Sequence, residues 1–399
     1  MAISDKLPVA TTRLTAAQRR AQLAEAAARR FEEVGYHRVS MADVAADTGV
    51  TAPAVYRHFR SKQDLLAGAI SSGLDLVEQT LAQKADNPLE EVVAAVAELV
   101  LDRRYLWTLL QREARFLNAE LYADVQAHFD RAINEFIRRV RMHRPGLKSR
   151  DARLLVTAAT SALATPSVPR SAPRSLIGRE LAEAATRVLL VPMPTGNSAN
   201  GGPTPKPAEP HDGTNTRRTK LLDTAIELFF HQGYAAVSLD DIGAAYGIAG
   251  PSLYHHFATK SDILVAAFAR ATDRLIEEHA QPRAGKARSL AELVDQYTDF
   301  CLRNRTLVGI YVSEAINLPP DSQRRIKTAL RNRVSDWSTA LQAEYEHVEQ
   351  RAARVRATTA LTVIDDLVRL GHFHTRPHIA AEIRAVAMAI LTGESQLDT

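Results

Sequence analysis

The sequence predicts an all-α protein made of two tandem modules, each a short N-terminal helical unit followed by a longer helical domain. One observation is an internal repeat: at an offset of 198 residues, without a gap, 17 of the 44 positions from 23 to 66 are identical. A second is the segment 192–214, PMPTGNSANGGPTPKPAEPHDGT, which has almost no large apolar side chains. A third is the near absence of alternating β-branched runs between tight turns, the usual signal of strands. Repetition on this scale indicates that one module occurs twice.

Composition is that of a folded protein in a reducing compartment. The chain has 399 residues, more than the roughly 100–200 that one ordinary domain holds. A single cysteine, Cys301, excludes an internal disulfide. No apolar run approaches the ~20 residues of a membrane span, and the first residues lack the apolar stretch of a signal peptide. We therefore expect a cytoplasmic protein, whose net charge of +4 permits nucleic-acid binding without demanding it.

Composition also suggests the domain boundaries. The proline- and glycine-rich segment cannot bury enough apolar surface to offset its ordering entropy, so we expect it to be a flexible linker. The expected parts are a disordered tail at 1–12, short helical units at 13–66 and 215–265, longer helical domains at 67–191 and 266–399, and the linker at 192–214.

The repeated unit begins with a supporting helix. Leu23, Ala27 and Phe31 fall at i, i+4 and i+8, which places them on one face. Gly35 ends this helix, since glycine tolerates a left-handed C-cap. The second copy has the same residues at Leu221, Ala225, Phe229 and Gly233.

Two shorter helices follow. Ser40-Met-Ala-Asp43 is a capping box that opens the second helix, which stops at Gly49. The third helix begins within three residues, carries Pro53 in its first turn, where a missing N–H costs nothing, and ends near Phe59. Another capping box, Ser61-Lys-Gln-Asp64, opens a longer helix. The second copy repeats these signals at Ser238–Asp241, Gly247, Pro251, Phe257 and Thr259–Asp262.

Two short helices joined by a tight glycine turn, behind a supporting helix, form a helix-turn-helix, whose second short helix fits a DNA major groove. We expect Val55 and Phe59 to point to the core, and Lys62 and Lys260 to grip phosphate. A plain helical hairpin with a solvated face is the alternative, but the same caps, glycines, aromatics and lysines recur in both copies. The predicted DNA-contacting residues are Ser40, Thr51, Ala52, Pro53, Tyr56, Arg57, His58 and Lys62, then Ser238, Gly250, Pro251, Ser252, Tyr254, His255, His256 and Lys260.

The pattern F-x3-G-Y-x3-S-x8-G-x6-Y-x-H-F-x2-K runs from Phe31 to Lys62 and again from Phe229 to Lys260. It resembles the TetR family of bacterial transcriptional regulators over about 50 residues per half. The resemblance implies an N-terminal DNA-reading unit of three helices, a C-terminal helical domain for dimerisation and ligand binding, and a protein held at the nucleoid through DNA. Two such units, with WTLLQREARFLNAE at 107–120, resemble the double-TetR regulators of mce (mammalian cell entry) lipid-import operons.

The resemblance also implies an effector cavity. In the family, the helix that borders it corresponds to Leu110–Ala114 and, 201 residues on, to Tyr311–Ala315. The narrower resemblance implies an apolar effector, such as a fatty acyl group, a sterol fragment or an acyl-CoA, and leaves open whether both halves keep a pocket. The implied ligand-binding candidates are Trp107, Arg112, Glu113, Arg115 and Phe116 in the first half and Tyr311, Glu314 and Asn317 in the second.

Each candidate also has a plainer interpretation. The aromatic residues are equally typical of an ordinary core, and the charged residues of a solvated face or an ion pair. Asp365-Asp366, on an apolar helix, either contacts a polar ligand group or comprises one exposed and one hydrogen-bonded acid.

The two copies differ where bases would be read. Arg57 is replaced by His255, and Thr51 and Ala52 by Ala249 and Gly250. Arginine pairs bidentately with guanine O6 and N7, whereas histidine does not. We therefore predict a regulator, with repression as the family's usual outcome, that reads an asymmetric operator as an intrachain pseudo-dimer or a homodimer.

Other function classes fit less well. An effector-independent architectural DNA-binding protein predicts more lysine and arginine in these units and a net charge above +4. A protein–protein scaffold that has lost DNA binding is opposed by the tyrosine, histidine and lysine retained in both copies. There is no phosphate-binding glycine loop, no Gly-x-Ser-x-Gly and no His-Glu-x-x-His, so we predict neither catalysis nor a cofactor.

A metal site is the last possibility in the sequence. His372, His374 and His378 have the spacing of metal ligands, but they lie in the loop-like stretch GHFHTRPH. No cysteine is near to supply a fourth ligand, so we predict no metal.

Overall fold

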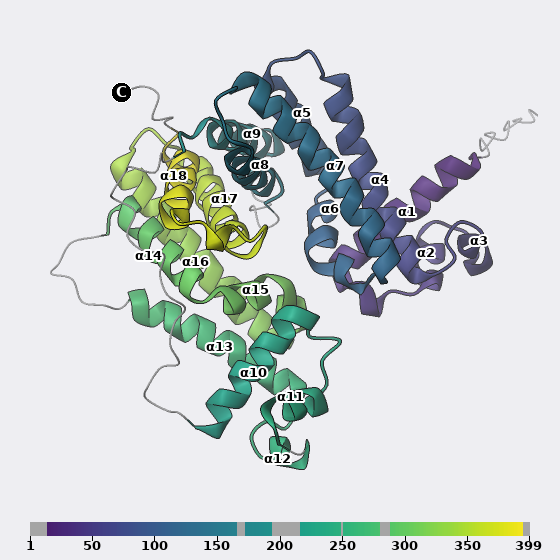
Figure 1. The fold of residues 1–399 in the computed structure, drawn as a ribbon. Helices are drawn as coiled ribbons and strands as arrows, with labels where there is room; N and C mark the ends of the chain where they lie inside the picture. The colour runs from purple at the N-terminus through teal and green to yellow at the C-terminus, as the bar shows by residue number, and fades with distance from the viewer. Residues whose placement is uncertain (1–13, 166–171, 194–215, 249, 280–287, 394–399) are drawn as a thin grey trace, which may run out of the picture. The chain divides into compact units, whose positions relative to one another are not determined.

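The computed structural model describes residues 14–165, 172–193, 216–248, 250–279 and 288–393, and every regular element within them is helical (Figure 1). The tail predicted at 1–12, nearly all of the predicted linker, and Ala249 lie outside the described residues. The side chains of Pro251 and of 276–279 are also outside this description. None of the helices in the described part is long and apolar enough to cross a membrane.

The first half begins with the three predicted helices, α1 to α3, which we call the first head. The elements of this half are α1 (Ala16–Val34), the 3-10 turn η1 (Tyr36–Arg38), α2 (Met41–Asp47), α3 (Ala52–Tyr56), α4 (Lys62–Gln83), α5 (Leu89–Asp102), α6 (Tyr105–Thr108), the π-helical turn η2 (Leu109–Glu113), the 3-10 turn η3 (Ala114–Phe116), α7 (Ala119–His143), α8 (Ser149–Leu163) and α9 (Arg174–Leu190).

The second half repeats this order, and α10 to α12 form the second head. Its elements are α10 (Arg217–Gln232), α11 (Leu239–Tyr246), α12 (Gly250–Tyr254), α13 (Lys260–His279), α14 (Leu290–Arg303), α15 (Arg305–Glu314), η4 (Ala315–Asn317), α16 (Pro320–Glu344), α17 (Gln350–Arg369), η5 (Phe373–Thr375) and α18 (Ile379–Thr392). The helices α14, α16 and α17 each begin 201 residues after their counterparts α5, α7 and α8. The repeat therefore continues beyond the heads, although the sequences there have diverged.

Local hydrogen bonds confirm the predicted helix starts. Ser40 Oγ accepts from the N–H of Asp43 at 3.2 Å, while the Asp43 carboxylate accepts from the N–H of Ser40 at 2.8 Å. The α11 capping box of the second head has the same geometry. Gly35 has φ 83° and ψ 154°, so its positive φ requires glycine, but its ψ differs from the left-handed C-cap we expected.

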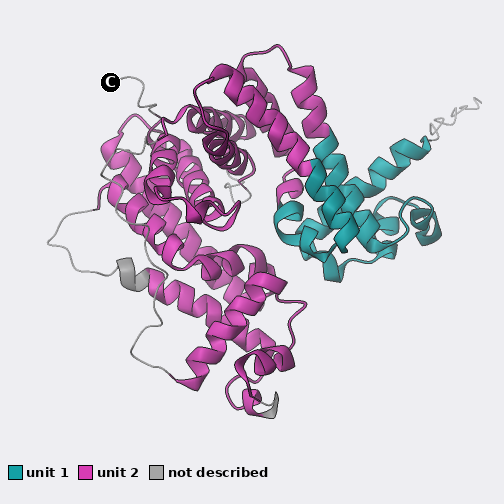
Figure 2. Cartoon of the chain, viewed as in Figure 1, with its two compact units in different colours: residues 1–75, 108–128 teal, residues 76–107, 129–399 magenta. Residues whose placement is uncertain are grey.

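The structure forms two compact units, whose boundaries differ from the predicted domain boundaries (Figure 2). Unit 1 comprises residues 1–75 and 108–128, and unit 2 comprises 76–107 and 129–399. The segment 108–128 therefore packs with the first head, although we assigned it to the following helical domain. The domain boundaries given above stay a prediction.

Each head has its own core. In unit 1, the predicted apolar face of α1 is fully buried at Leu23, Ala27 and Phe31, as are Val55 and Phe59 beside the third helix. In unit 2, the second head buries its counterparts at Leu221, Ala225, Phe229, Leu253 and Phe257. These buried side chains fix which face of α3 and of α12 remains outside.

Within unit 2, the C-terminal parts of both halves share one hydrophobic core. Buried residues of α8 and α9 belong to the same cluster as those of α17 and α18. Polar pairs join the halves: Arg356 Nε lies 2.7 Å from Glu180 Oε2, and Arg376 lies 2.6 Å from Asp151. All four side chains are mostly buried.

Candidate nucleic-acid interface

The third helix of each head presents a polar and aromatic face. Tyr56 is 53% exposed and Tyr254 is 55% exposed, whereas most of the other large apolar side chains in the two heads are buried. Arg57 and His255, the next residues, are also exposed. The arrangement leaves these side chains available to a partner, and aromatic and basic groups of this kind suit DNA edges and phosphates.

The other predicted contacts of the reading helices occupy the same faces. Where their side chains are described, they are exposed or partly exposed: Thr51, Ala52, Pro53 and His58 in the first head, and Ser252 and His256 in the second. Pro53 lies in the first turn of α3, as predicted. DNA contact by these residues stays a prediction.

The two capping serines have hydroxyls that are already engaged. Ser40 Oγ lies 2.7 Å from the Asp43 carboxylate, and Ser238 Oγ lies 2.6 Å from that of Asp241. The Ser40 hydrogen bonds lower the pKa of the Asp43 carboxyl, and those of Ser238 lower the pKa of Asp241. Both serines thus order the start of the second helix, and DNA contact through their side chains stays a prediction.

Lys62 is held inside its head. Its ammonium donates to the carbonyls of Tyr36 and Val39 at 2.9 Å each and lies 4.2 Å from the centre of the Tyr36 ring. Burial lowers the pKa of Lys62. The sequence placed this lysine at phosphate, whereas the structure uses its donors to fix the turn between α1 and α2.

Lys260 repeats this arrangement in the second head. It donates to the carbonyls of Tyr234 and Val237 at 2.8 and 2.7 Å, over the ring of Tyr234. Because two copies share the geometry, the lysine is a structural part of each head. Phosphate contact by either lysine requires these bonds to break and stays a prediction.

An arginine that the sequence reading missed supports the end of each reading helix. The Arg20 guanidinium lies 4.1 Å from the centre of the Phe59 ring and donates to the carbonyl of His58. Arg218 lies 4.2 Å from the Phe257 ring in the second head. The two arginines are 198 residues apart, so the repeat itself contained the signal, just before the aligned stretch.

Arg112 and Glu113 contact the first head. Glu113, only 2% exposed, accepts a 3.0 Å hydrogen bond from the N–H of Tyr36 and pairs with Arg112. Arg112 donates to the carbonyls of Phe31 and Glu32 at 2.9 Å each. The π-helical turn therefore holds the C-terminal end of α1, and effector contact by these two residues stays a prediction.

Phe116 packs on the same turn. Its ring stacks on Tyr36 with centroids 5.4 Å apart and meets His37 edge-on at 4.4 Å, while Gln63 donates to its carbonyl. Arg115 lies over the Phe116 ring at 5.0 Å. Both of these candidates for effector contact therefore belong to the junction with the first head.

The second-half candidates separate into two groups. Glu314, fully buried, accepts from Asn317 Nδ2 at 2.8 Å and acts electrostatically on Tyr234 and Lys260 of the second head. Tyr311 instead packs against Phe268, with ring centroids 5.4 Å apart. Glu314 thus mirrors Glu113, and Tyr311 packs against the core that the second head buries.

Trp107 and the acidic pair lie together in unit 2. Trp107 Nε1 donates to Asp366 Oδ2 at 3.4 Å, and Arg369 pairs with the same carboxylate at 2.6 Å. Asp365 accepts from Tyr297 Oη at 2.8 Å. Both acids are therefore hydrogen-bonded, and neither is the exposed acid of our plainer interpretation.

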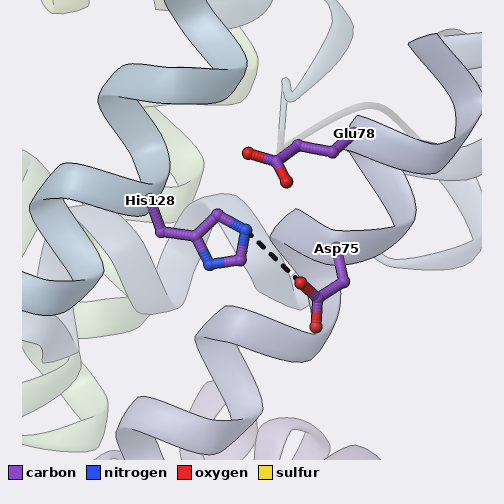
Figure 3. Close-up of side chains that lie close together, drawn as sticks. All are labelled: Asp75, Glu78 and His128. Atoms are coloured by element: carbon purple, nitrogen blue, oxygen red, sulfur yellow. Dashed lines mark ion pairs between the residues drawn. The ribbon is translucent and has the colours of Figure 1, made fainter. Parts of the chain in front are cut away.

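Among the described residues, His372, His374 and His378 do not form a group of three side chains whose ligand atoms lie close together. The rings of His372 and His374 have centroids 6.1 Å apart. A histidine and acids approach each other elsewhere: His128 Nε2 on α7 lies 3.4 Å from Asp75 Oδ1 on α4, and Glu78 follows one turn along α4 (Figure 3). Asp75 is exposed, and an ion pair accounts for this contact.

Comparison with known proteins identifies both heads. The family described as bacterial regulatory proteins, tetR family, matches residues 23–69 and 221–267. The repressor KstR2 of Rhodococcus jostii is 46% identical over 61 residues, which is 15% of this chain and 30% of that protein. The activator FasR of Mycolicibacterium smegmatis is 32% identical over 83 residues, 21% of this chain and 34% of that protein. The chain therefore spans about a third of the length of these curated relatives.

Among solved structures, one is similar to this chain at low sequence identity. A tetR-family regulator from Bordetella parapertussis is 18% identical, with 47% of this chain and 98% of that one covered and a TM-score of 0.42. These relatives are named as regulators of transcription, and none is named as an enzyme.

Proposed function

Since this chain is a tandem member of the tetR family of bacterial regulatory proteins, with one DNA-binding domain in each half, we propose that it regulates transcription by reading an asymmetric operator. The observation that carries the proposal is that α3 and α12 both present exposed faces that differ in chemistry, with Arg57 in one and His255 in the other. A two-chain regulator presents identical heads and so needs a palindrome. Two unlike heads in one chain remove that constraint.

We further propose that one chain is an intrachain pseudo-dimer. Support comes from the hydrophobic core that α8 and α9 share with α17 and α18. Each half already buries its apolar helix faces against the other half of the same chain. Linking the heads makes the second binding event intramolecular, at an effective concentration of order mM. The protein then acts in the cytoplasm, at the nucleoid.

Repression is our proposed outcome, tuned by a small effector with an apolar, fatty-acyl or sterol-derived body. The resemblance to the double-TetR regulators of lipid-import operons supports this effector class. The two curated relatives named above are a repressor and an activator, so the direction of regulation needs its own measurement.

The test is the mass of the complex formed on the DNA upstream of the protein's own gene, combined with a footprint. One chain covering two dissimilar half-sites supports the proposal. Two chains on a palindrome contradict it, because only one head per chain would then read sequence. Equal protection of unrelated DNA would favour the alternative, an effector-independent architectural protein.

A further inference from the structure

Six polar or aromatic side chains from four helices of the second half meet in unit 2. We call them the polar cluster: Tyr297 and Cys301 of α14, Tyr311 of α15, Arg333 and Trp337 of α16, and Asp365 of α17. Arg333 Nη1 donates to Tyr297 Oη at 3.2 Å, and that hydroxyl donates to Asp365 at 2.8 Å. The Cys301 thiol approaches the same carboxylate at 3.6 Å.

The polar cluster lies at the edge of the core: Tyr297, Cys301 and Trp337 are buried, whereas Tyr311, Arg333 and Asp365 are partly exposed. Trp337 is fully buried and meets Tyr297 edge-on, with ring centroids 5.9 Å apart. Arg333 lies 4.8 Å from the centre of the Tyr297 ring. Tyr311 is close enough to act electrostatically on Arg333. Phe300, Val294 and Leu361 belong to the same core, so the surroundings are apolar.

Donors in the polar cluster exceed acceptors. The Trp337 indole N–H has no acceptor among the described residues, although it is completely buried. Arg333 makes a single hydrogen bond to the cluster, through Nη1. A buried donor without an acceptor costs about 1–3 kcal/mol, so folding alone does not favour this arrangement. An oxygen acceptor supplied by a ligand would satisfy the Trp337 indole N–H.

The first half has no counterpart of these groups. At the offset of 201 residues that relates the helices, every member is replaced by an apolar residue. The replacements are Val96 for Tyr297, Val100 for Cys301, Leu110 for Tyr311, Ala132 for Arg333, Phe136 for Trp337 and Ala164 for Asp365. The same helical framework is therefore built without the polar cluster, so the fold does not require it.

We propose that the second half alone binds the effector, and that the polar cluster holds an oxygen acceptor, a carboxylate or carbonyl, carried on an apolar molecule. This inference rests on the proposed function. It adds which half of the chain binds the effector and which chemical group the effector carries. The guanidinium of Arg333 and the indole N–H of Trp337 donate to that oxygen. The apolar core around them suits the rest of the ligand.

The two tryptophans of the chain, Trp107 and Trp337, provide a direct readout. Full-length protein labelled with 5-fluorotryptophan gives one fluorine resonance for each, and Trp337→Phe assigns them. The probes share one chain length: octanoate for a carboxylate, 2-octanone for a neutral carbonyl, and octylammonium as a control whose head group only donates. We expect octanoate or 2-octanone to shift the Trp337 resonance at millimolar concentration, and octylammonium to leave it unchanged.

Variants of α16 separate the cluster from general stability. Arg333→Ala introduces the residue that the first half has at the corresponding position, Ala132, and should weaken probe binding about tenfold or more. Arg331→Ala, on the exposed face of the same helix, should not weaken it. Arg333→Gln keeps N–H donors without the charge and serves if the alanine variant does not fold. It should weaken octanoate more than 2-octanone.

The proposal is overturned if neither oxygen-bearing probe shifts the resonance, if octylammonium shifts it equally, or if both Arg333 variants bind as the unchanged protein does. DNA binding is measured separately, without probe, on the upstream DNA. Loss of the probe response with DNA binding intact refutes this proposal only, whereas absent DNA binding refutes the proposed function.

Discussion

The backbone N–H of Tyr36 donates a 3.0 Å hydrogen bond to the buried carboxylate of Glu113, which lies 77 residues further along the chain. On one side of this bond is the turn that follows α1. On the other is the π-helical turn η2, a kind of irregular turn often found at functional sites. Because well-packed interiors transmit small displacements, we expect a shift of η2 to move the turn between α1 and α2.

Replacing Glu113 with alanine should destabilise the protein by about 3 kcal/mol, because it leaves the Tyr36 N–H and Arg112 Nε without their acceptor. Glu113→Gln keeps an acceptor and should lose less. Urea unfolding with an unchanged m-value measures the difference. The exposed Glu120 provides the control, and equal losses for E113A and E120A would contradict the assigned role.

Lys62→Met should lower stability by about 1–3 kcal/mol, since its ammonium bridges two carbonyls of the α1–α2 turn. The slope of log affinity against log salt should stay the same, because no phosphate contact is lost. A slope reduced by about one would instead show that the lysine reaches DNA, as the sequence suggested. Lys148→Met, on an exposed side chain, is the control.

Arg57→Ala should cost about 1–3 kcal/mol of binding on an operator with guanine at the contacted position, and much less once that base is changed. Affinity measured on a panel of permuted operators reports this. Uniform losses across the panel would restrict Arg57 to phosphate contact. His255→Ala tests the second head, and its losses should fall in the other half-site.

Glu180 and Arg356 should show strong coupling, because each is mostly buried and breaking such a pair strands a charge. We expect E180A and R356A each to lose about 3 kcal/mol, and the double variant to lose clearly less than the two together. Asp321 and Arg324 of α16 provide an exposed pair for comparison, expected to couple by less than about 1 kcal/mol. Additive losses at the buried pair would contradict its role in joining the halves.

The polar cluster makes stability depend on pH. Burial raises the pKa of Asp365 from 3.8 to about 6, while Tyr297, Arg333 and Cys301 oppose the shift and Asp366 adds to it. Between these two values the folded chain keeps a proton that the unfolded chain has released, so stability falls as pH rises through this window.

Asp365→Asn removes this effect while keeping an acceptor for Tyr297. The variant should exceed the unchanged protein in stability at about pH 7.5, by at most about 3 kcal/mol, and the gap should close at about pH 4. Thermal unfolding across this range measures it. A gap that does not vary with pH would mean that the carboxyl titrates normally in the fold.

Local features of this fold were predictable because their signals are short in sequence. Three signals each act within a few residues: the Ser40–Asp43 capping box, the glycines at helix ends and Pro53 in the first turn of α3. Their spacing was therefore sufficient to locate the heads. The exposed face of α3 followed from the same periodicity, since Val55 and Phe59 are the buried pair.

Contacts between distant segments were not predictable in this way. Arg112 and Glu113 were assigned to an effector cavity, but their partners are backbone groups of α1 and the turn after it, more than 70 residues away. Spacing carries no information about such pairs. The carbonyl partners of the Lys62 ammonium were not predicted for the same reason, as they precede it by more than 20 residues.

One long-range signal was nevertheless present in the sequence. The offset changes from 198 to 201 between the heads and the helical domains, and only the second offset pairs Arg333 with Ala132 and Asp365 with Ala164. This difference between polar residues in the second half and apolar residues in the first can be interpreted only with the structure, in which α14, α15, α16 and α17 bring the polar residues together.

The core that α8 and α9 share with α17 and α18 also changes how the regulator responds to its own abundance. A regulator assembled from two chains is paired in proportion to the square of its free concentration when it is scarce, so dilution at cell division separates it. In the proposed intrachain pseudo-dimer, pairing is intramolecular and does not depend on how many copies the cell holds. Operator occupancy would then rise in proportion to the copy number when the protein is scarce, rather than to its square.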